Sequence, residues 1–201
     1  MMMTDPLHVA LRVIGVFEQL KIPYLIGGSL ASSAHGIPRS TQDIDLVADM
    51  GEDHVGPFVE SLQGEFYVDE LLIRRAIRRK SSFNLIHSET SFKVDVFIFK
   101  DSPFARSEMA RRRAERLSPE TAQELYLASP EDIVLEKLAW YKLGGGASDR
   151  QWDDLLGILK VQAGRLDTGY IEHWAGALGL SDLWRQLLKD RQGSEGEGSP
   201  A

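Results

Sequence analysis

Along the first hundred residues of the chain, the spacing of hydrophobic residues alternates between that of a helix and that of a strand. Leu7, Leu11, Ile14 and Phe17 recur at the spacing of one helical face, which predicts a helix over residues 6–20. Short apolar runs bounded by glycine, proline or polar residues predict strands over residues 24–26, 43–48, 66–68, 83–87 and 92–98. Helices are expected between the strands, over residues 29–35, 53–62 and 71–79. This part of the chain therefore predicts a small mixed sheet flanked by helices, with its last two strands paired as an antiparallel hairpin.

The helical period dominates after the first hundred residues. Helices are expected over residues 104–113, 130–142, 150–161, 170–178 and 181–189. Two short strands, over residues 116–117 and 124–127, would extend the sheet. Residues 191–201 contain mostly Gly, Ser, Glu and other polar residues, so they have little to bury and are expected to form a disordered tail. The predicted organisation is an α+β core domain over residues 1–115, a mainly helical region over residues 116–190 packed on that core, and the tail.

Composition excludes several classes of protein. The 201 residues include no cysteine, which rules out disulfide scaffolds, thiolate catalysis and cysteine-ligated zinc. The 30 acidic and 23 basic residues give a formal net charge of −7, so the chain as a whole is not a basic nucleic-acid coat protein. No apolar run approaches the length of a membrane span, and residues 1–6 lack the features of a signal peptide. The expected location is the cytoplasm, with no membrane partner.

Three aspartates supply the candidate chemistry. Asp43 and Asp45 stand two residues apart on one predicted strand, so both side chains point to the same face while their apolar neighbours point to the core. Asp95 lies on a later predicted strand, between two valines. Adjacent carboxylates repel one another, and a divalent cation such as Mg²⁺ or Mn²⁺ removes that penalty. If the two strands are neighbours, the three carboxylates form one site that suits two metal ions.

A glycine-rich turn precedes the first pair of aspartates. Gly27 and Gly28 end a short apolar strand, and Ser29 opens a predicted helix. Gly28 allows a phosphate to approach the backbone closely, and Ser29 offers it a hydroxyl and free N–H groups. Arg39, which lies shortly before Asp43, is placed to reach a phosphate. An Asp-x-Asp pair alone is a weak signal, but the turn, the pair and the third aspartate together indicate a metal site that handles phosphate.

Gly28-Ser29, Asp43-Ile44-Asp45 and Asp95, in this order, resemble the signature of the nucleotidyltransferase superfamily with the DNA polymerase β-like fold. More narrowly, residues 131–138 and 149–154 resemble the helical lysine motif and the Arg/Asp-rich helix start of the AbiEii-type small bacterial nucleotidyltransferases. Some members of that group are toxins of toxin–antitoxin pairs. The resemblance covers about residues 22–159 and implies a polymerase β-like core, with a small mixed sheet flanked by helices, followed by a C-terminal helical region.

The resemblance also implies an activity and a set of site residues. The activity is the Mg²⁺- or Mn²⁺-dependent transfer of a nucleoside monophosphate from a nucleoside triphosphate to an acceptor, with release of pyrophosphate. Asp43 and Asp45 would hold the two metal ions, and Asp95 would hold the second ion and act as base toward the acceptor. Lys137 would contact the triphosphate, and Asp153 would support the site. The acceptor stays open between tRNA, a protein side chain and a small molecule.

Partners and alternative functions follow from the remaining features. Arg74, Arg75, Arg78 and Arg79 crowd one predicted helix, which is either a solvated face or a contact surface for the phosphates of an RNA acceptor. A toxin would also have a cognate antitoxin as its partner. The alternative from another class is a non-catalytic regulatory or partner-binding protein on the same fold, which the loss of a carboxylate would favour, yet all three are present. A metal-dependent phosphohydrolase is disfavoured because the sequence shows no Asp/His metal cluster.

Overall fold

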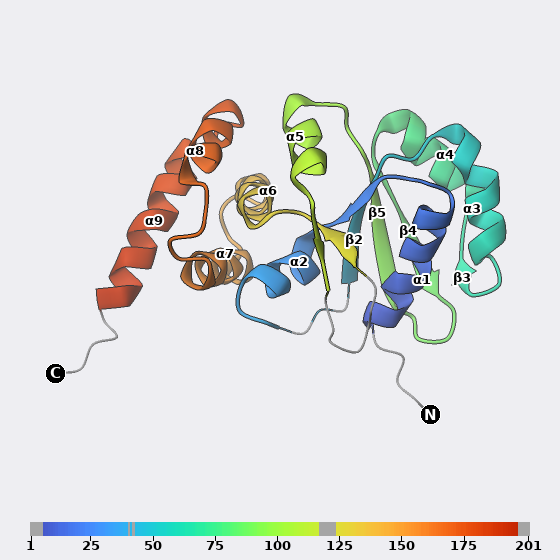
Figure 1. Ribbon diagram of the computed structural model, residues 1–201, viewed down its shortest axis with the longest axis horizontal. Coiled ribbons are helices and arrows are strands. Elements are labelled where there is room, and N and C mark those ends of the chain that lie inside the picture. Colours follow the sequence, from blue (N-terminus) through green and yellow to red (C-terminus); the bar gives the residue numbers. More distant parts are fainter. Residues whose placement is uncertain (1–5, 40, 42, 117–123, 197–201) are drawn as a thin grey trace. The chain divides into compact units, whose positions relative to one another are not determined.

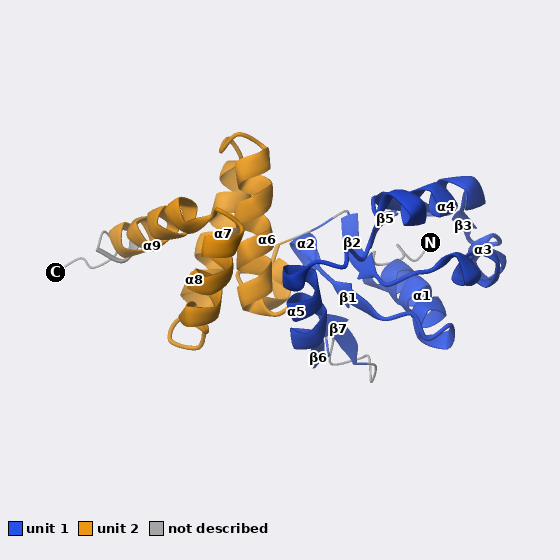
Figure 2. Ribbon diagram, turned by 90° about the horizontal axis from the view of Figure 1, so that it is seen from above, with its two compact units in different colours: residues 1–30, 40–127 blue, residues 31–39, 128–201 orange. Residues whose placement is uncertain are grey.

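The computed structural model describes residues 6–39, 41, 43–116 and 124–196 of the chain (Figure 1). Its contacts divide the chain into two compact units, shown in different colours in Figure 2. Unit 1 comprises residues 1–30 and 40–127, and unit 2 comprises residues 31–39 and 128–201. One of the division points falls inside helix α2 (Gly28–His35).

Unit 1 is built on a mixed sheet. Its seven strands in the described residues are β1 (Tyr24–Ile26), β2 (Asp43–Ala48), β3 (Phe66–Tyr67), β4 (Ser82–His87), β5 (Lys93–Ile98), β6 (Arg113–Glu115) and β7 (Leu125–Leu127). Their order across the sheet is β3-β4-β5-β2-β1-β7-β6. The pairs β2–β5 and β1–β7 are parallel, and the other neighbours are antiparallel, including the predicted hairpin of β4 and β5. The sheet is therefore mixed, as the sequence pattern predicted.

The core of unit 1 lies on one face of this sheet. Helices α1 (Pro6–Gln19), α3 (Val55–Leu62) and α4 (Glu70–Arg79) lie together on one side of the central strands (Figure 1). Phe58 of α3 stacks on Phe17 of α1, with ring centroids 5.4 Å apart, and meets Phe83 of β4 edge-on at 6.1 Å. Ile44 and Val94, from β2 and β5, are also fully buried. The alternation of the strands consequently sends every second side chain of β2, β4 and β5 away from this core.

Two further elements complete unit 1. A short 3₁₀ helix, η1 (Glu52–His54), leads into α3, and helix α5 (Pro103–Arg111) follows β5. The hydroxyl of Ser102 caps α5 by accepting a hydrogen bond from the Ala105 N–H.

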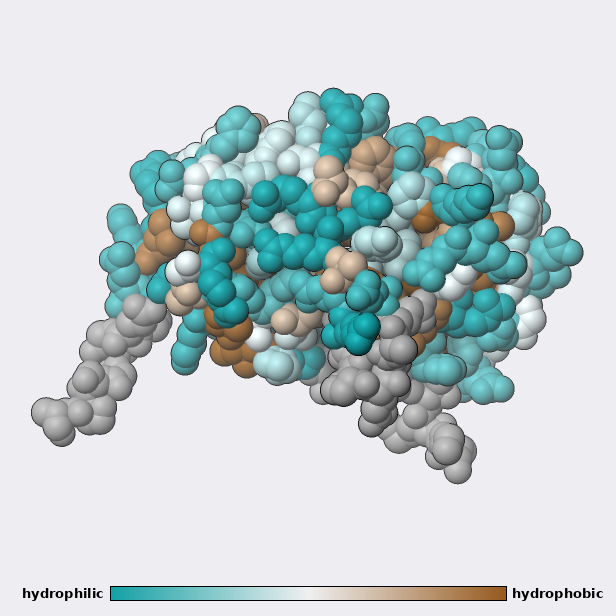
Figure 3. Space-filling model, viewed as in Figure 1, coloured by the Kyte–Doolittle hydropathy of each residue, from teal (hydrophilic) through white to brown (hydrophobic). Residues whose placement is uncertain are grey.

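Unit 2 is helical in the part of the chain that the structure describes. Besides the end of α2, it contains α6 (Pro130–Leu143), α7 (Asp149–Val161), α8 (Thr168–Ala177) and α9 (Ser181–Gly196). Ser129, Ser148 and Asp167 cap α6, α7 and α8 by accepting a backbone N–H of the first turn. Leu135 and Ile158 are among the apolar residues that the helices bury between them. No helix among the described residues is long and apolar enough to cross a membrane, and hydrophilic residues cover much of the surface in Figure 3.

Two differences between the observed elements and the sequence predictions are at α5 and α9. Helix α5 ends at Arg111 rather than near residue 113, because β6 already begins at Arg113, and the strand predicted over residues 116–117 therefore lies slightly earlier. Helix α9 continues to Gly196, six residues into the predicted tail, because Arg191, Gln192 and their neighbours propagate a helix that has already begun. The remaining predicted tail, like residue 117, lies outside the described residues.

Candidate functional site

The three candidate carboxylates lie on the open face of the sheet in unit 1. Strands β2 and β5 are parallel neighbours in a register that places Asp45 opposite Asp95 and Asp43 opposite Lys93. The neighbouring residues Ile44 and Val94 point into the core, so these four side chains point to the other face. Asp43 is exposed, whereas Asp45 and Asp95 are half-buried. The structure thus brings together all three aspartates that the sequence singled out.

The surroundings of Asp45 destabilise the negative charge of its carboxylate. Burial raises the pKa of its carboxyl group, and the negative charges of Asp95 and Asp43 raise it further. A hydrogen bond from the Ser29 backbone and the positive charge of Lys93 lower the pKa but do not outweigh the first group of effects. Burial and the neighbouring carboxylates therefore disfavour the ionised form of Asp45, which a bound cation would stabilise.

The glycine-rich turn is built directly against Asp45. The Gly27 N–H donates a hydrogen bond to the Asp45 carbonyl at 2.9 Å, which fixes the turn to β2. Gly28 has a φ of +55°, and a Cβ atom at this position would lie 1.8 Å from Oδ2 of Asp45. Only glycine fits here, because both the backbone conformation and the space exclude a side chain. The N-terminus of α2, with Ser29, is consequently held beside the carboxylates.

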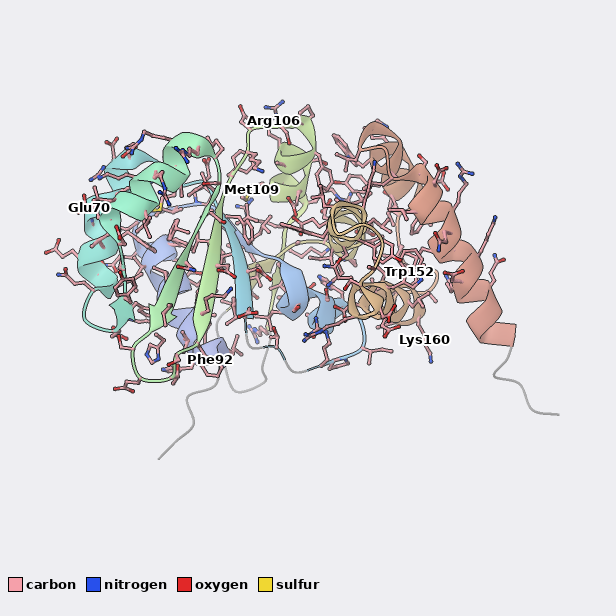
Figure 4. All side chains as sticks on the ribbon, turned by 180° about the vertical axis from the view of Figure 1, so that it is seen from behind. Glu70, Phe92, Arg106, Met109, Trp152 and Lys160 are labelled. Atoms are coloured by element: carbon pink, nitrogen blue, oxygen red, sulfur yellow. The ribbon has the colours of Figure 1, made fainter. Side chains whose placement is uncertain are left out.

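Lys93 is a site residue that the sequence analysis did not single out. Its Nζ lies 2.7 Å from Oδ2 of Asp95 and 4.0 Å from Oδ1 of Asp43. The hydrogen bond to Asp95 raises the pKa of the Lys93 ammonium above its ordinary value. The sequence did contain a signal for Lys93: it stands two positions before Asp95, so both side chains lie on one face of a strand. Phe92, labelled in Figure 4, marks the point where β5 begins, one residue before Lys93.

The carboxylates suit a divalent metal ion by their chemistry, because hard oxygen ligands are those that Mg²⁺ and Mn²⁺ prefer. Within the described residues, however, no group of three or more His, Cys, Asp or Glu side chains is arranged to hold a metal ion. Lys93 instead binds two of the carboxylates through its ammonium group. The donor set therefore fits a metal ion that replaces this ammonium.

A second cluster of charged residues lies in unit 2. Asp154 of α7 accepts hydrogen bonds from Arg39, at 2.8 and 2.9 Å, and from Nζ of Lys137, at 2.8 Å. The side chains of Lys137 and Asp154 are only 10% and 8% exposed. Burial alone would raise the pKa of the Asp154 carboxyl group, but the hydrogen bonds from Arg39 and Lys137 reverse this effect, and the pKa is lowered. Two cations, Arg39 and Lys137, thus share the carboxylate of Asp154.

Asp153 of α7 is the residue that the sequence analysis expected to support the site. It is exposed, whereas the next residue, Asp154, holds Arg39 and Lys137. One residue turns the side chain by about 100° around a helix, which is enough to exchange an inward for an outward position. The helical phase was the available signal, because Asp154 lies four residues before the buried Ile158.

The structure does not bring the basic stretch to the carboxylates. Helix α4 packs on the core face of the sheet, whereas Asp43, Asp45 and Asp95 lie on the open face. Arg74 is paired with Glu52 and with Glu70, which is labelled on α4 in Figure 4, at 2.8 Å each. Arg78 also contacts Glu52, at 3.3 Å, while Arg75 and Arg79 remain on the exposed side of the helix. Half of the arginines proposed for RNA are therefore already engaged by acidic side chains.

Known proteins resemble this chain in structure but not in sequence. No family model and no curated protein sequence matches it. The solution structure of the antibiotic-resistance factor ANT(2'')-Ia matches with a TM-score of 0.53 and 16% identity, over 98% of this chain and 100% of that one. The crystal structure of ANT(2'')-Ia in complex with adenylyl-2''-tobramycin gives a TM-score of 0.52 and 16% identity, over 85% and 94% of the two chains. An antigenic nucleotidyltransferase-like protein from Paracoccidioides brasiliensis gives 0.50 and 17%, over 92% and 93%.

These likenesses establish the fold. At 16–17% identity they extend to the architecture and not to the individual residues. The fold is α+β, of the polymerase β-like nucleotidyltransferase type, which confirms the fold class expected from the sequence. The narrower likeness to the AbiEii-type proteins stays a prediction.

Proposed function

We propose that this chain is a metal-dependent nucleotidyltransferase, which transfers a nucleoside monophosphate from a nucleoside triphosphate to an acceptor. The observation that carries the proposal is the register of β2 and β5, which sets Asp45 beside Asp95 next to the Gly28-Ser29 turn. This arrangement occurs in a fold that the chain shares with nucleotidyltransferases. Two features that are independent in the sequence, a phosphate-binding turn and a carboxylate cluster, thereby support one chemistry.

Asp43, Asp45 and Asp95 are the proposed ligands of Mg²⁺ or Mn²⁺, with two ions expected. When bound, the metal neutralises charge on the triphosphate and on the attacking oxygen. The raised pKa of Asp45 supports this assignment, because burial and the negative charges of Asp95 and Asp43 disfavour its ionised form, which a cation would stabilise.

The residues of the chain supply binding, orientation and proton transfer. The N-terminus of α2, where Gly28 leaves room for close approach, is the proposed binding place of the nucleotide phosphates. Asp95 accepts the proton of the acceptor hydroxyl while the oxygen of that hydroxyl forms a bond to the α-phosphorus. The bond between the α-phosphorus and the bridging oxygen breaks at the same time, and pyrophosphate leaves with the electron pair of that bond. Catalysis then depends on position and charge rather than on a covalent intermediate.

Arg39 and Lys137 are proposed to bind the polyphosphate of the nucleotide. The cationic side chains of Arg39 and Lys137 support this role, because guanidinium and ammonium groups are the side chains that bind phosphate oxygens. Asp154 holds both cations in place, so we assign it the supporting role first expected of Asp153.

The acceptor class is the least constrained part of the proposal. One structural neighbour was crystallised with adenylyl-2''-tobramycin, which favours a small molecule among the three candidate acceptors. The pairing of Arg74 and Arg78 with acidic residues gives no support to RNA binding at α4. A toxin role with a cognate antitoxin remains a prediction from the AbiEii-type motifs alone.

The transfer reaction is tested by the incorporation of label from α-labelled nucleoside triphosphates into the acceptor, which accompanies the release of pyrophosphate. Wild type is assayed with Mg²⁺ or Mn²⁺ and with tRNA, protein extract or polyhydroxylated small molecules as acceptor pools. Asp95→Asn should lower transfer by about 100-fold or more, because a positioned general base contributes about that much. Asp53→Asn, at an exposed position of η1, is the matched control and should leave the rate unchanged. Transfer at full rate by Asp95→Asn would contradict the assignment of the base.

A further inference from the structure

Lys93 is the one cation on the open face of the sheet that the described contacts place among the three aspartates. Its register partner on β2 is Asp43, and Asp95 follows two residues later on the same strand. On the other side, its register partner on β4 is Ile86, which carries no charge. The ammonium group therefore takes its partners from the carboxylate cluster.

The contacts of Lys93 engage the atoms that a metal ion would need. Nζ lies 2.7 Å from Oδ2 of Asp95, which is a short charge-assisted hydrogen bond, and 4.0 Å from Oδ1 of Asp43. A carboxylate oxygen that accepts this bond cannot at the same time offer the same lone pair to a metal ion. An ammonium group and a divalent cation in this place would also repel each other.

We propose that Lys93 is the internal counter-ion of the carboxylate cluster and competes with the divalent metal ion for it. Lys93 is then a positioning residue, which holds Asp95 and Asp43 in the metal-free protein and sets how tightly the metal binds. The inference rests on the proposed function, because it takes the three aspartates as the metal ligands.

The side chain of Lys93 is able to give way to a metal ion. It is 39% exposed, on a flexible four-carbon stem, so its ammonium group can turn into solvent without a change in the backbone. This displacement breaks the hydrogen bond between Nζ of Lys93 and Asp95, so metal binding must compensate for the loss of that bond. Metal affinity in the wild type should consequently be lower than the same three carboxylates would give without the lysine.

The test is the binding of Mn²⁺ alone, measured from the electron paramagnetic resonance signal of the free ion. Lys93→Met removes the charge and keeps an apolar stem of similar length, whereas Lys93→Arg keeps the charge. Lys100→Met is the matched control, because Lys100 is exposed just after β5. Lys93→Met should bind Mn²⁺ roughly tenfold more tightly than wild type, the order expected when one unit charge about 4 Å away is removed from a partly screened site. Lys93→Arg and Lys100→Met should bind as wild type does.

A second readout separates this role from a purely structural one. Without metal, Lys93→Met should unfold at a lower temperature than wild type, because the carboxylates then repel one another without compensation. Saturating Mn²⁺ should raise its unfolding temperature by more than it raises that of wild type. A lysine that only packed on the sheet would lower the unfolding temperature equally with and without the metal.

The outcomes distinguish this inference from the proposed function. Equal or weaker Mn²⁺ binding by Lys93→Met would overturn the competition, while a wild type that still bound metal and nucleotide would leave the proposed function standing. If neither protein bound Mn²⁺, in the presence or absence of nucleoside triphosphate, both would fall together.

Discussion

Gly28 and Asp45 illustrate how single residues constrain the candidate site. A glycine in a strand-to-helix turn is an ordinary feature, and the sequence alone could not tell this one from a simple chain reversal. The structure gives it a specific reason, because a Cβ atom at position 28 would overlap the carboxylate of Asp45. The same carboxylate has a raised pKa, so the turn and the charge cluster depend on each other.

Gly28→Ala should disrupt both folding and binding. The left-handed φ of +55° and the overlap with Asp45 should lower the free energy of unfolding by about 1–3 kcal/mol, and nucleotide binding should be lost. Gly15→Ala in α1 is the control, since a Cβ atom there meets nothing within 4 Å, and it should raise stability by about 0.5–1 kcal/mol. Urea unfolding measures both changes. A Gly28→Ala protein as stable as wild type would show that the turn is not packed on Asp45 in this way.

Asp45→Asn should stabilise the metal-free protein while it removes a metal ligand. The pKa of Asp45 is higher in the folded state than in the unfolded chain, so its ionised form disfavours folding above the folded pKa. The substitution should therefore raise the free energy of unfolding at pH 7 by about 1 kcal/mol, and the gain should vanish as the pH falls below the unfolded pKa of an aspartate, about 3.9. Unfolding curves collected from pH 3 to pH 8 test this. A gain that persisted at pH 3 would contradict the electrostatic origin.

Asp154→Asn should have the opposite effect on stability. The lowered pKa of Asp154 means that its ionised form stabilises the fold above the unfolded pKa, and that this contribution is lost as the pH falls through the folded pKa. Leaving Arg39 and Lys137 without their shared carboxylate should cost about 3 kcal/mol. Asp153→Asn, at the exposed neighbouring position, should change stability by less than about 0.5 kcal/mol. Equal effects of the two substitutions in urea unfolding would refute the pairing.

The secondary structure elements were largely predictable, but their pairing, apart from the β4–β5 hairpin, was not. Alternation along β2 was enough to place Asp43 and Asp45 on one face, because that property depends on a single strand. The placement of Asp95 beside Asp45 depends on the parallel pairing of β2 with β5, which are separated in the chain by a 3₁₀ helix, two α-helices and two strands. No local pattern encodes such a register. The spacing of Lys93 and Asp95 on one strand was visible in the sequence, but the proximity of Lys93 to Asp43 depends on the same pairing of β2 with β5.

Helices α6 and α8 are joined by a buried polar contact that tests the architecture of unit 2. Asp132 is fully buried and accepts a hydrogen bond from the hydroxyl of Ser129, at 2.5 Å, and from the hydroxyl of Tyr170, at 2.6 Å. Tyr170→Phe removes one donor and should lower the free energy of unfolding by about 1–3 kcal/mol. Tyr67→Phe, at a residue that is 65% exposed, is the control and should change stability by less than about 0.5 kcal/mol. Urea unfolding in which both variants match wild type would argue against this contact.

At the scale of the whole molecule, composition and fold limit the function from two directions. The formal net charge of −7 argues against non-specific binding to nucleic acid, and acidic partners neutralise part of the basic helix α4. The polymerase β-like fold supports nucleotidyl transfer, but a fold alone does not identify a substrate. What distinguishes a transferase from a non-catalytic protein of the same fold is the ability of Asp43, Asp45 and Asp95 to bind metal and nucleotide together.

The most direct test of this central claim is calorimetric binding of each nucleoside triphosphate in the presence of Mg²⁺. Wild type should bind at least one of the four, and Asp43→Asn/Asp45→Asn should abolish the metal-dependent part of that binding. Asp53→Asn should bind as wild type does. Binding that survives the double substitution, or no binding to wild type with Mg²⁺ or Mn²⁺, would contradict the account and favour a regulatory or partner-binding protein on the nucleotidyltransferase fold.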